Sequence, residues 1–349
     1  MQGINLSAFF AGASTMYFLM WAVMTLTRRQ RSRYQTMLGW TFVAWTLSNL
    51  KDIIITFPEL YTEQVQNYIL IVDGWMAISF TILIFEITMP GWTTRRRFLL
   101  LGIPWLLFTA VYIVWPLQAV IRAYIVYLWC YAWVIIAIAY FKGRKYIRYI
   151  RNNFSNIDQI DISWLKYFFW FCIVCQLSWL ATSLMYNVYA DSIYYISTIL
   201  MWQMVIHYSY HFTPISIEPQ QPLTATQVKD YTFAEKVDEM VEQEKLYLST
   251  DLSLEELANR LHTNRTYLSD YFNRVKQTTF YDYINQLRIE RIAVPMIQQH
   301  PEYTIEYIAA KSGFKSLSTF RRSFLKLKDV TPSQYRSQFK ANNITSFSD

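Results

Sequence analysis

Two stretches in the C-terminal part of the chain place polar and charged side chains where they could contact the edges of nucleic-acid bases. In residues 264–276 and 316–327, apolar residues recur at helical spacing, which leaves the opposite face of each predicted helix polar. An arginine there can donate two parallel hydrogen bonds to guanine O6 and N7, and an aspartate can accept from the cytosine amino group. The eight outward positions are Arg265, Thr266, Ser269, Asp270, Leu317, Ser318, Arg321 and Arg322.

These faces also have a plainer interpretation, in which their charges are simply solvated. Asp270 stands four residues before Arg274 and can pair with it along one face of the helix. Charge distribution favours nucleic acid, because residues 260–349 contain 14 Lys and Arg against 7 Asp and Glu, whereas the helix predicted before them is acidic. We therefore expect the basic side of this region to face phosphates.

Each polar stretch follows a shorter predicted helix. In the first case Ser253 is a natural N-cap with Glu256 three residues later, and apolar residues at helical spacing extend to residue 261. The chain then turns at His262–Thr263 before the helix over 264–276. The inward positions of that helix are Leu268, Phe272 and Val275. Two short helices joined by a tight turn are typical of a helix-turn-helix motif.

The arrangement recurs about 51 residues later, which argues against chance. Thr304 is positioned to cap a short helix, Gly313 supplies the turn, and a second helix follows over 316–327. Between the two motifs, residues 280–299 predict a linking helix with its own apolar face.

Residues 233–338 resemble the DNA-binding domain of AraC-type (AraC/XylS) transcriptional regulators through two runs, LSLEELANRLHTNRTYLSDYFNRVKQTTFYDYINQLRIERI and YTIEYIAAKSGFKSLSTFRRSFLKLKDVTPSQYR. The most specific matching positions are Gly313, Phe314, Phe320, Phe324, Thr331, Pro332, Tyr335 and Arg336. The resemblance implies two helix-turn-helix units held by a linking helix, each placing one helix in successive major grooves on one face of the DNA. It also implies that the eight outward positions contact bases or phosphates.

Two positions depart from the family pattern. Asp329 stands where the family usually has Gly, and Pro295 falls inside the predicted linking helix. A proline inside a helix removes one backbone hydrogen bond and usually kinks the helix. We expect such a kink to change the angle between the two motifs without abolishing either one.

Seven hydrophobic stretches of the length needed to cross a bilayer precede this region. They cover residues 5–27, 36–57, 68–90, 98–119, 121–141, 164–185 and 193–213. The loops after the first, third and fifth stretches hold 12 Lys and Arg, whereas the alternate loops hold Arg122 alone. This bias places the N-terminus outside and the C-terminus in the cytoplasm.

Four ionisable residues within these stretches are candidates for a functional role, because charges are costly in a membrane. Lys51 and Asp73 fall at nearly one depth, so an ion pair between their helices is plausible. With Asp52 it could be structural, or it could line a polar pocket that opens outward and receives a signal. Glu86 lies near the inner end of its stretch, where Arg95, Arg96 and Arg97 are the nearest predicted partners.

The predicted fold is all-α, a polytopic transmembrane helix bundle followed by a cytoplasmic double helix-turn-helix domain. The boundaries are 1–213 for the transmembrane domain (sensor or anchor), 214–232 for a linker, 233–340 for the AraC-type domain and 341–349 for a tail. We expect a membrane-embedded, sequence-specific transcriptional regulator of a bacterial inner membrane. Its expected partners are promoter double-stranded DNA, the lipid bilayer, a second copy in a homodimer, and an unknown small-molecule or protein signal.

The sequence predicts no enzyme, no metal site and no cofactor, because no catalytic constellation or phosphate-binding Gly-rich loop is present. Two other classes stay open: a receptor or transporter whose C-terminal domain binds a protein, and an intramembrane enzyme with a regulatory tail. Proteolytic release of the DNA-binding domain at Pro214–Thr226 is a variant of the main interpretation.

Overall fold

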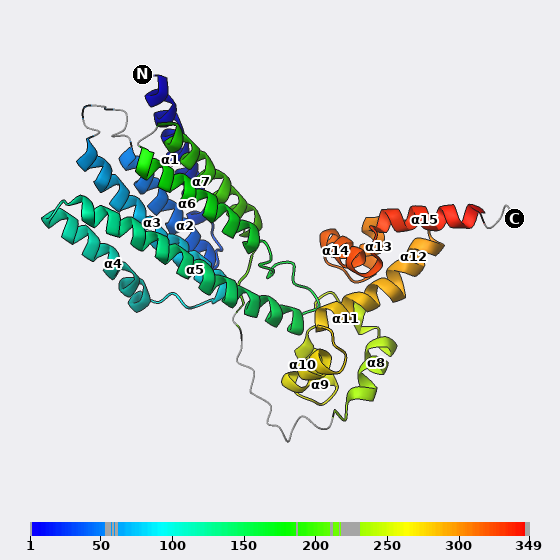
Figure 1. Cartoon of the computed structure of the whole chain (residues 1–349). Coiled ribbons are helices and arrows are strands. Elements are labelled where there is room, and N and C mark those ends of the chain that lie inside the picture. Colours follow the sequence, from blue (N-terminus) through cyan, green and yellow to red (C-terminus); the bar gives the residue numbers. More distant parts are fainter. Residues whose placement is uncertain are drawn as a thin grey trace. The chain divides into compact units, whose positions relative to one another are not determined.

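The computed structural model describes residues 2–52, 62–185, 188–209, 212–215 and 231–345, together with residues 57, 59 and 217. The chain divides into an N-terminal unit, Met1–Tyr146 with Ile162–Ser216, and a C-terminal unit, Ile147–Asp161 with Ile217–Asp349 (Figure 1). Throughout the described residues the regular elements are helices, with one isolated antiparallel bridge between Phe154 and Ser253. The fold is therefore all-helical, in agreement with the sequence.

Seven long helices begin in the N-terminal part of the described chain. They are α1 (Gln2–Leu26), α2 (Arg33–Leu50), α3 (Glu63–Thr88), α4 (Arg95–Val114), α5 (Gln118–Asn153), α6 (Leu165–Met185) and α7 (Val188–Ser209). Helix α1 packs against α2 and α7, while α3 packs against α2 and α4 (Figure 1). The break between α4 and α5 lies at residues 115–117, a few residues before the boundary predicted between the fourth and fifth hydrophobic stretches.

Aromatic rings from four helices form the centre of the N-terminal unit. Trp202 of α7 contacts Trp45 of α2 with ring centroids 5.7 Å apart and Phe80 of α3 with centroids 5.3 Å apart. Phe18 of α1 contacts Trp45 with centroids 5.3 Å apart. A second cluster joins α3, α4 and α5 around the buried Trp105 and Tyr124. Such rings bury large areas and interlock at fixed angles, so they hold the helices in register.

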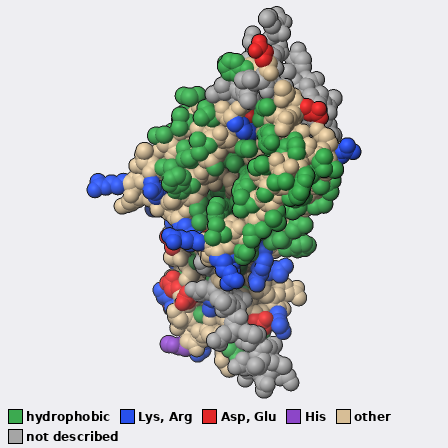
Figure 2. Space-filling view, turned by 90° about the vertical axis from the view of Figure 1, so that its left-hand side faces the viewer, with side chains coloured by type: hydrophobic (Ala, Val, Ile, Leu, Met, Phe, Trp, Pro, Cys, Tyr) green, Lys and Arg blue, Asp and Glu red, His purple; other side chains and the backbone are tan. Residues whose placement is uncertain are grey.

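The outer face of the N-terminal unit is apolar. Figure 2 shows hydrophobic side chains covering much of one face, with Lys and Arg side chains gathered at one edge of that surface. Among the residues that the structure describes, four helices are long and apolar enough to cross a bilayer: Ala8–Leu26, Glu63–Thr88, Arg95–Val114 and Gln118–Asn153. These features are compatible with membrane insertion, while the count of seven spans and their orientation stay predictions.

Helix α5 is longer than the sequence interpretation allowed. Residues 142–151, expected in a loop, continue the helix to Asn153, and residues 147–161 belong to the C-terminal unit. A boundary at residue 214 therefore leaves out a segment that packs with the helix-turn-helix motifs. The predicted linker 214–232 lies mostly outside the described residues, as do residues 346–349 of the predicted tail.

Ten further helical elements build the C-terminal unit within the described residues. They are α8 (Ala234–Gln243), η3 (Leu246–Leu248), α9 (Leu254–Arg260), α10 (Arg265–Arg274), α11 (Phe280–Leu287), η4 (Arg288–Ala293), α12 (Val294–Gln299), α13 (Ile305–Lys311), α14 (Leu317–Lys328) and α15 (Pro332–Thr345). The pairs α9–α10 and α13–α14 are the two predicted helix-turn-helix motifs. Each motif has its own buried core, the first around Leu257, Leu268 and Phe272 and the second around Ile308, Phe320 and Phe324.

Hydrogen-bonding side chains begin these helices where the sequence predicted. Ser253, Asn264, Thr304 and Ser316 each accept a hydrogen bond from a backbone N–H in the first turn of α9, α10, α13 and α14. These caps satisfy N–H groups that otherwise have no partner within a helix, and each contributes about 1 kcal/mol. Glu256 does not complete a capping box, since its carboxylate accepts from Arg260 at 3.1 Å instead.

The two departures from the family pattern have clear structural consequences. The chain stays helical from Phe280 to Gln299, but residues Arg288–Ala293, just before Pro295, adopt π-helical spacing. A proline cannot donate the backbone bond of a regular α-helix, and a π-turn is one way in which a helix accommodates that loss. Asp329 ends α14 in the left-handed region with φ of 57°, a conformation that favours Gly but that Asp adopts more readily than most residues.

Candidate nucleic-acid interface

Helix α10 carries the first four predicted contact residues, and their exposure differs from the expectation. Leu268 and Phe272 are buried as predicted, and Arg265 and Thr266 are half-buried. Ser269, expected to face outward, is only 4% exposed, and the side chain of Asn273 donates to its carbonyl at 2.7 Å. Val275, expected to face the core, is 54% exposed because the helix ends at Arg274. Both expectations of exposure are wrong, and contact of Ser269 with DNA stays a prediction.

Asp270 is engaged within its own motif. Its carboxylate pairs with Arg274 at 2.8 Å, the partner four residues later that the sequence left open, and accepts from the Tyr231 hydroxyl at 2.7 Å. The hydroxyl of Tyr231 connects Asp270 to the segment before α8, so the carboxylate also attaches that segment to α10. A carboxylate with two partners is less available to a cytosine amino group than an unpaired one.

Helix α14 carries the other four predicted contact residues and exposes three of them. Ser318 is exposed, and the side chains of Arg321 and Arg322 are 56% and 55% exposed. Leu317 is half-buried and packs on the second core, so it is less outward than expected. Arg321 lies 3.5 Å from Glu306 of α13. Two adjacent exposed guanidinium groups on a short helix are the arrangement that can reach guanine edges or phosphates.

The sequence interpretation missed a segment that contacts both motifs. Residues 147–161, which we call the strap, comprise the end of α5 and the loop that follows it. The Phe154–Ser253 bridge joins the strap to the first motif, with Ser155 N–H donating to the Leu252 carbonyl at 3.1 Å. On the second motif, the Thr319 hydroxyl donates to Asp158, and Arg322 donates to Asp161 at 3.4 Å. In the sequence, the signal that could have indicated this contact was the pair Asp158 and Asp161, which follows a run of basic residues.

The strap also contacts α10, which is the second helix of the first motif, and α11, which begins the linking helix. Arg265 of α10 donates to the Tyr149 hydroxyl at 3.4 Å, and its guanidinium stands 5.9 Å from the centre of the same ring. Arg151 lies 3.8 Å from Asp282 of α11 and 5.4 Å from the centre of the Tyr281 ring. The strap therefore contacts one predicted DNA-facing arginine in each motif.

A buried arginine connects these parts. Arg288 is 1% exposed and donates to the carbonyls of Tyr247 at 2.6 Å, Ser249 at 2.7 Å and Ser155 at 3.2 Å. Burial lowers the pKa of Arg288 to about 10, which leaves the guanidinium charged at neutral pH. A buried charge is tolerated only when its donors are satisfied, so Arg288 requires these backbone acceptors in place.

A polar hollow of about 440 Å³ lies where α10, α11, α14 and the strap meet. Its basic lining residues are Arg151, Arg322 and Lys326, and Lys326 donates to Asp282 at 2.9 Å. The pKa of Arg322 is raised: its partial burial acts in the opposite direction, but Tyr281 and Asp161 outweigh that effect. The hollow brings basic groups of the second motif beside the strap.

The polar candidates of the N-terminal unit form two separate groups. Lys51 lies 2.6 Å from both Asp73 and Asp52, and Tyr195 donates to Asp52 at 2.8 Å. The predicted Lys51–Asp73 ion pair is therefore confirmed. Glu86, by contrast, pairs with Arg33 at 3.0 Å and not with the arginines at 95–97, because the start of α2 lies beside the end of α3.

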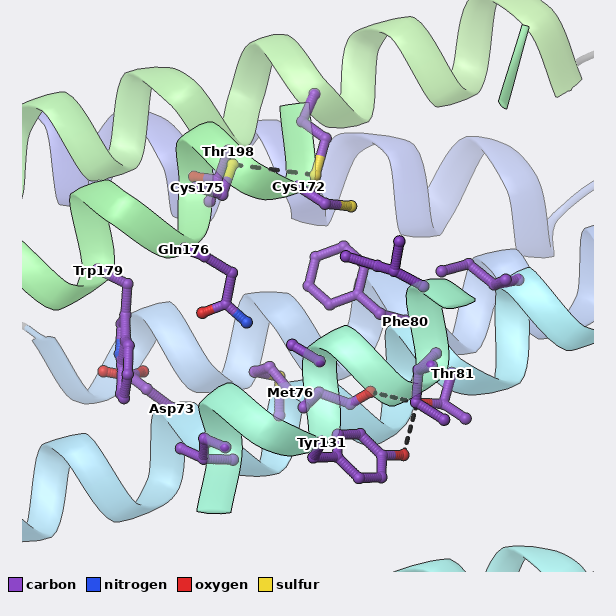
Figure 3. A pocket seen from close by; sticks show the side chains of 18 of the residues that line it. Asp73, Met76, Phe80, Thr81, Tyr131, Cys172, Cys175, Gln176, Trp179 and Thr198 are labelled. Carbon is purple, nitrogen blue, oxygen red and sulfur yellow. Dashed lines mark hydrogen bonds between the residues drawn. The ribbon is translucent and has the colours of Figure 1, made fainter. Parts of the chain in front are cut away.

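A cavity of about 120 Å³ lies inside the N-terminal unit, next to the Lys51 cluster. Helices α2, α3, α5, α6 and α7 contribute to its mostly apolar wall, which includes Trp45, Phe80 and Trp179. Its polar groups include Asp73, Gln176 and the hydrogen-bonded pair Thr81–Tyr131, whose oxygens are 2.6 Å apart. Figure 3 shows Gln176 reaching from α6 into the space beside Met76.

Comparison with known proteins identifies the C-terminal part. Residues 257–338 match the family described as a helix-turn-helix domain. The uncharacterized HTH-type transcriptional regulator YtdP of Bacillus subtilis (strain 168) is 35% identical over 89 residues, which cover 26% of this chain and 11% of that protein. An uncharacterized HTH-type transcriptional regulator of Staphylococcus aureus (strain COL) is 28% identical over 137 residues, 39% of this chain and 17% of its own length.

The chain thus spans less than a fifth of the length of these relatives. No solved structure matches the chain significantly. The C-terminal part contains an AraC-type helix-turn-helix domain that is homologous to HTH-type transcriptional regulators.

Proposed function

We propose that this protein is a membrane-embedded transcriptional regulator that binds promoter DNA in a sequence-specific manner through its C-terminal unit. One observation carries the proposal: two capped helix-turn-helix motifs stand on one linking helix, and α14 exposes Arg321 and Arg322 on its outer face. Each bidentate arginine contact to guanine supplies about 1–3 kcal/mol of discrimination. The homologous transcriptional regulators support this function.

The N-terminal unit anchors the regulator in the bacterial inner membrane with seven spans, and the C-terminal unit lies in the cytoplasm. Insertion is supported by the exposed apolar side chains and by the four helices of sufficient length and composition in the described part of the chain. A water-soluble protein rarely exposes so large an apolar surface. The excess of Lys and Arg after the first, third and fifth stretches supports the orientation.

The anchoring unit also receives the signal, which binds in the cavity beside Asp73 and Gln176. A largely apolar site of about 120 Å³ suits a small neutral molecule about the size of one aromatic ring, with a polar group that bonds the carboxylate or the amide. Asp73 both lines the cavity and pairs with Lys51, so a molecule bound in the cavity alters the surroundings of this ion pair. Occupancy of the cavity is thereby linked to the packing of α2 against α3.

The test of DNA binding uses the full chain in lipid nanodiscs. Genomic fragments retained near physiological salt are sequenced, with the Arg321→Ala/Arg322→Ala variant as control. We expect one motif with two major-groove half-sites about one helical turn apart, and its loss in the variant. Diffuse, salt-sensitive retention that is equal in both proteins would instead indicate non-specific binding and favour a C-terminal domain that recognises a protein.

The cavity is tested separately by thermal unfolding of the nanodisc-bound chain with benzene, phenol and benzylamine. We expect phenol to raise the unfolding temperature most, since it combines an apolar ring with a donor for Asp73 or Gln176. The Gln176→Leu variant, which keeps the wall but removes the amide, should reduce the difference between phenol and benzene. Equal shifts with all three probes in both proteins would contradict a specific site.

A further inference from the structure

We infer that the strap and DNA compete for the same face of the C-terminal unit, so that the strap holds the DNA-binding domain in a closed state. The inference rests on the proposed DNA-binding function and adds its regulation. Its basis is that residues 147–161 contact Arg265 of the first motif and Arg322 of the second, two of the residues predicted to face DNA. The guanidinium of Arg322 cannot bind a strap aspartate and DNA at once, and that of Arg265 lies against the Tyr149 hydroxyl of the strap.

The backbone part of the strap is firmly attached to the first motif. Ser155 is 1% exposed, its N–H bonds the Leu252 carbonyl, and its carbonyl accepts from Arg288. Because Arg288 also bonds Tyr247 and Ser249, removal of this attachment would leave a buried charge with fewer acceptors. The attachment therefore keeps the acidic part of the strap near the interface even when DNA displaces it from α14.

The acidic part occupies the place that phosphate would take. Asp158 accepts from the Thr319 hydroxyl, and Asp161 accepts from Arg322. A hydroxyl and a guanidinium at the side of a recognition helix are typical phosphate contacts. Two carboxylates held there imitate the charge of the DNA backbone and repel it by the same charge.

This contact is weak enough to be exchanged. The Asp161–Arg322 pair is 3.4 Å long, and its Arg322 side chain is 55% exposed although that of Asp161 is only 15% exposed. Water therefore reaches the pair from the arginine side and keeps its contribution small. Asp158 Oδ2 is buried without a hydrogen-bond partner among the described residues, which makes the closed arrangement less favourable. DNA, with several phosphates, can displace these two carboxylates without disturbing the Arg288 attachment.

Connectivity gives this competition a regulatory use. The strap continues into α5 at one end and leads to α6 at the other, and both helices contribute side chains to the cavity of the N-terminal unit. A change in the relative position of α5 and α6 thus alters the two ends of the strap directly. The strap then withdraws its two carboxylates, Asp158 and Asp161, from α14 or returns them to it.

The test measures DNA affinity of the full chain in nanodiscs, with the most enriched genomic fragment and an unrelated fragment of equal length. The Asp158→Asn/Asp161→Asn variant removes both strap charges with little change in shape. Its matched control, Glu302→Gln/Glu306→Gln, also removes two carboxylates, one just before α13 and one on α13 that pairs with Arg321, but leaves the strap intact. We expect the strap variant to bind the enriched fragment about tenfold more tightly than the native chain, and clearly more tightly than the control.

Hydrogen–deuterium exchange provides a second measurement that does not depend on charge. Added DNA should accelerate exchange at residues 156–161 of the native chain, because the strap must leave α14. Equal affinities in the strap variant and its control, or slower exchange of residues 156–161 with DNA bound, would overturn the competition while leaving DNA binding intact. Absence of any sequence-specific binding in all three proteins would overturn the proposed function and the competition together.

Discussion

The two helix-turn-helix motifs have the same scaffold but present different surfaces. Both begin their helices with polar N-caps and bury an apolar core of similar layout. On the outer face, α10 has a buried Ser269 and an Asp270 with two partners, whereas α14 exposes Arg321 and Arg322. The apolar core pattern therefore specifies the helix-turn-helix motif, whereas the residues on the outer face of its second helix can differ from one motif to the other.

The turns differ as well, and this difference allows the strongest prediction. The first motif turns at His262 with φ of 53°, and the second turns at Gly313 with φ of 84°. A Cβ on Gly313 would lie 2.9 Å from the Leu248 carbonyl oxygen, a backbone atom that cannot easily move. We expect Gly313→Ala to destabilise the second motif by about 2–3 kcal/mol through strain and collision.

The measurement is hydrogen–deuterium exchange of residues 305–328 compared with residues 254–274 in the full chain. The matched control is His262→Ala, which keeps the same backbone region but adds no atom. Exchange should accelerate strongly in the second motif of Gly313→Ala and only slightly in the first motif of His262→Ala. Similar acceleration in both variants would show that the two turns are equivalent.

The second prediction concerns the reading surfaces. We expect Arg321→Ala to lower the ratio of specific to non-specific DNA affinity by roughly tenfold or more, because one bidentate contact is worth about 1–3 kcal/mol. Arg265→Ala should lower the ratio by less, since Arg265 is half-buried and lies against Tyr149. Titration of both variants with matched and mismatched fragments decides this, and a larger loss in Arg265→Ala would reverse the assigned roles of the motifs.

The third prediction concerns whether the Asp270 carboxylate of the first motif contacts a DNA base. Because Tyr231 and Arg274 already bond the carboxylate, we expect Asp270→Asn to leave the selected DNA motif unchanged. The loss of a charged acceptor should instead cost up to about 1 kcal/mol in local stability. Sequencing of selected fragments checks the outcome, and a new adenine preference at one position would show that residue 270 contacts a base.

The smallest expected effect is a pH dependence of α8 and α11, the helices that flank the first motif in the chain. Burial raises the pKa of Asp238, but hydrogen bonds from Lys276 and Tyr283 outweigh it and lower the pKa below its usual value. A lowered pKa stabilises the fold above the ordinary aspartate value, and this contribution disappears as the pH falls through the native pKa.

The stability difference between the native chain and Asp238→Asn should therefore shrink from pH 5 to pH 3, from a value below about 1 kcal/mol. Hydrogen–deuterium exchange rates of α8 and α11 measure this stability difference, with Glu235→Gln as the control variant. A difference that stays constant over this range would assign Asp238 a role independent of its charge.

Much of the C-terminal unit follows from local sequence. Caps at Ser253 and Thr304, the turn at Gly313 and the main core positions of α10 and α14 were predictable, because helical periodicity and capping depend on residues within a few positions. The AraC-type domain was recognised on these same features. The seven-span count and the DNA-contact residues stay predictions.

Only the tertiary structure decided which distant residues meet. The partner of Glu86 is Arg33, Arg288 bonds Ser155, and Asp161 reaches Arg322 across 161 positions in the chain. No local period predicts such pairs, because they depend on where whole helices lie in space. Sequence alone therefore determined the helices, their caps and their cores, whereas the contact of the strap with the reading surface arises from long-range packing.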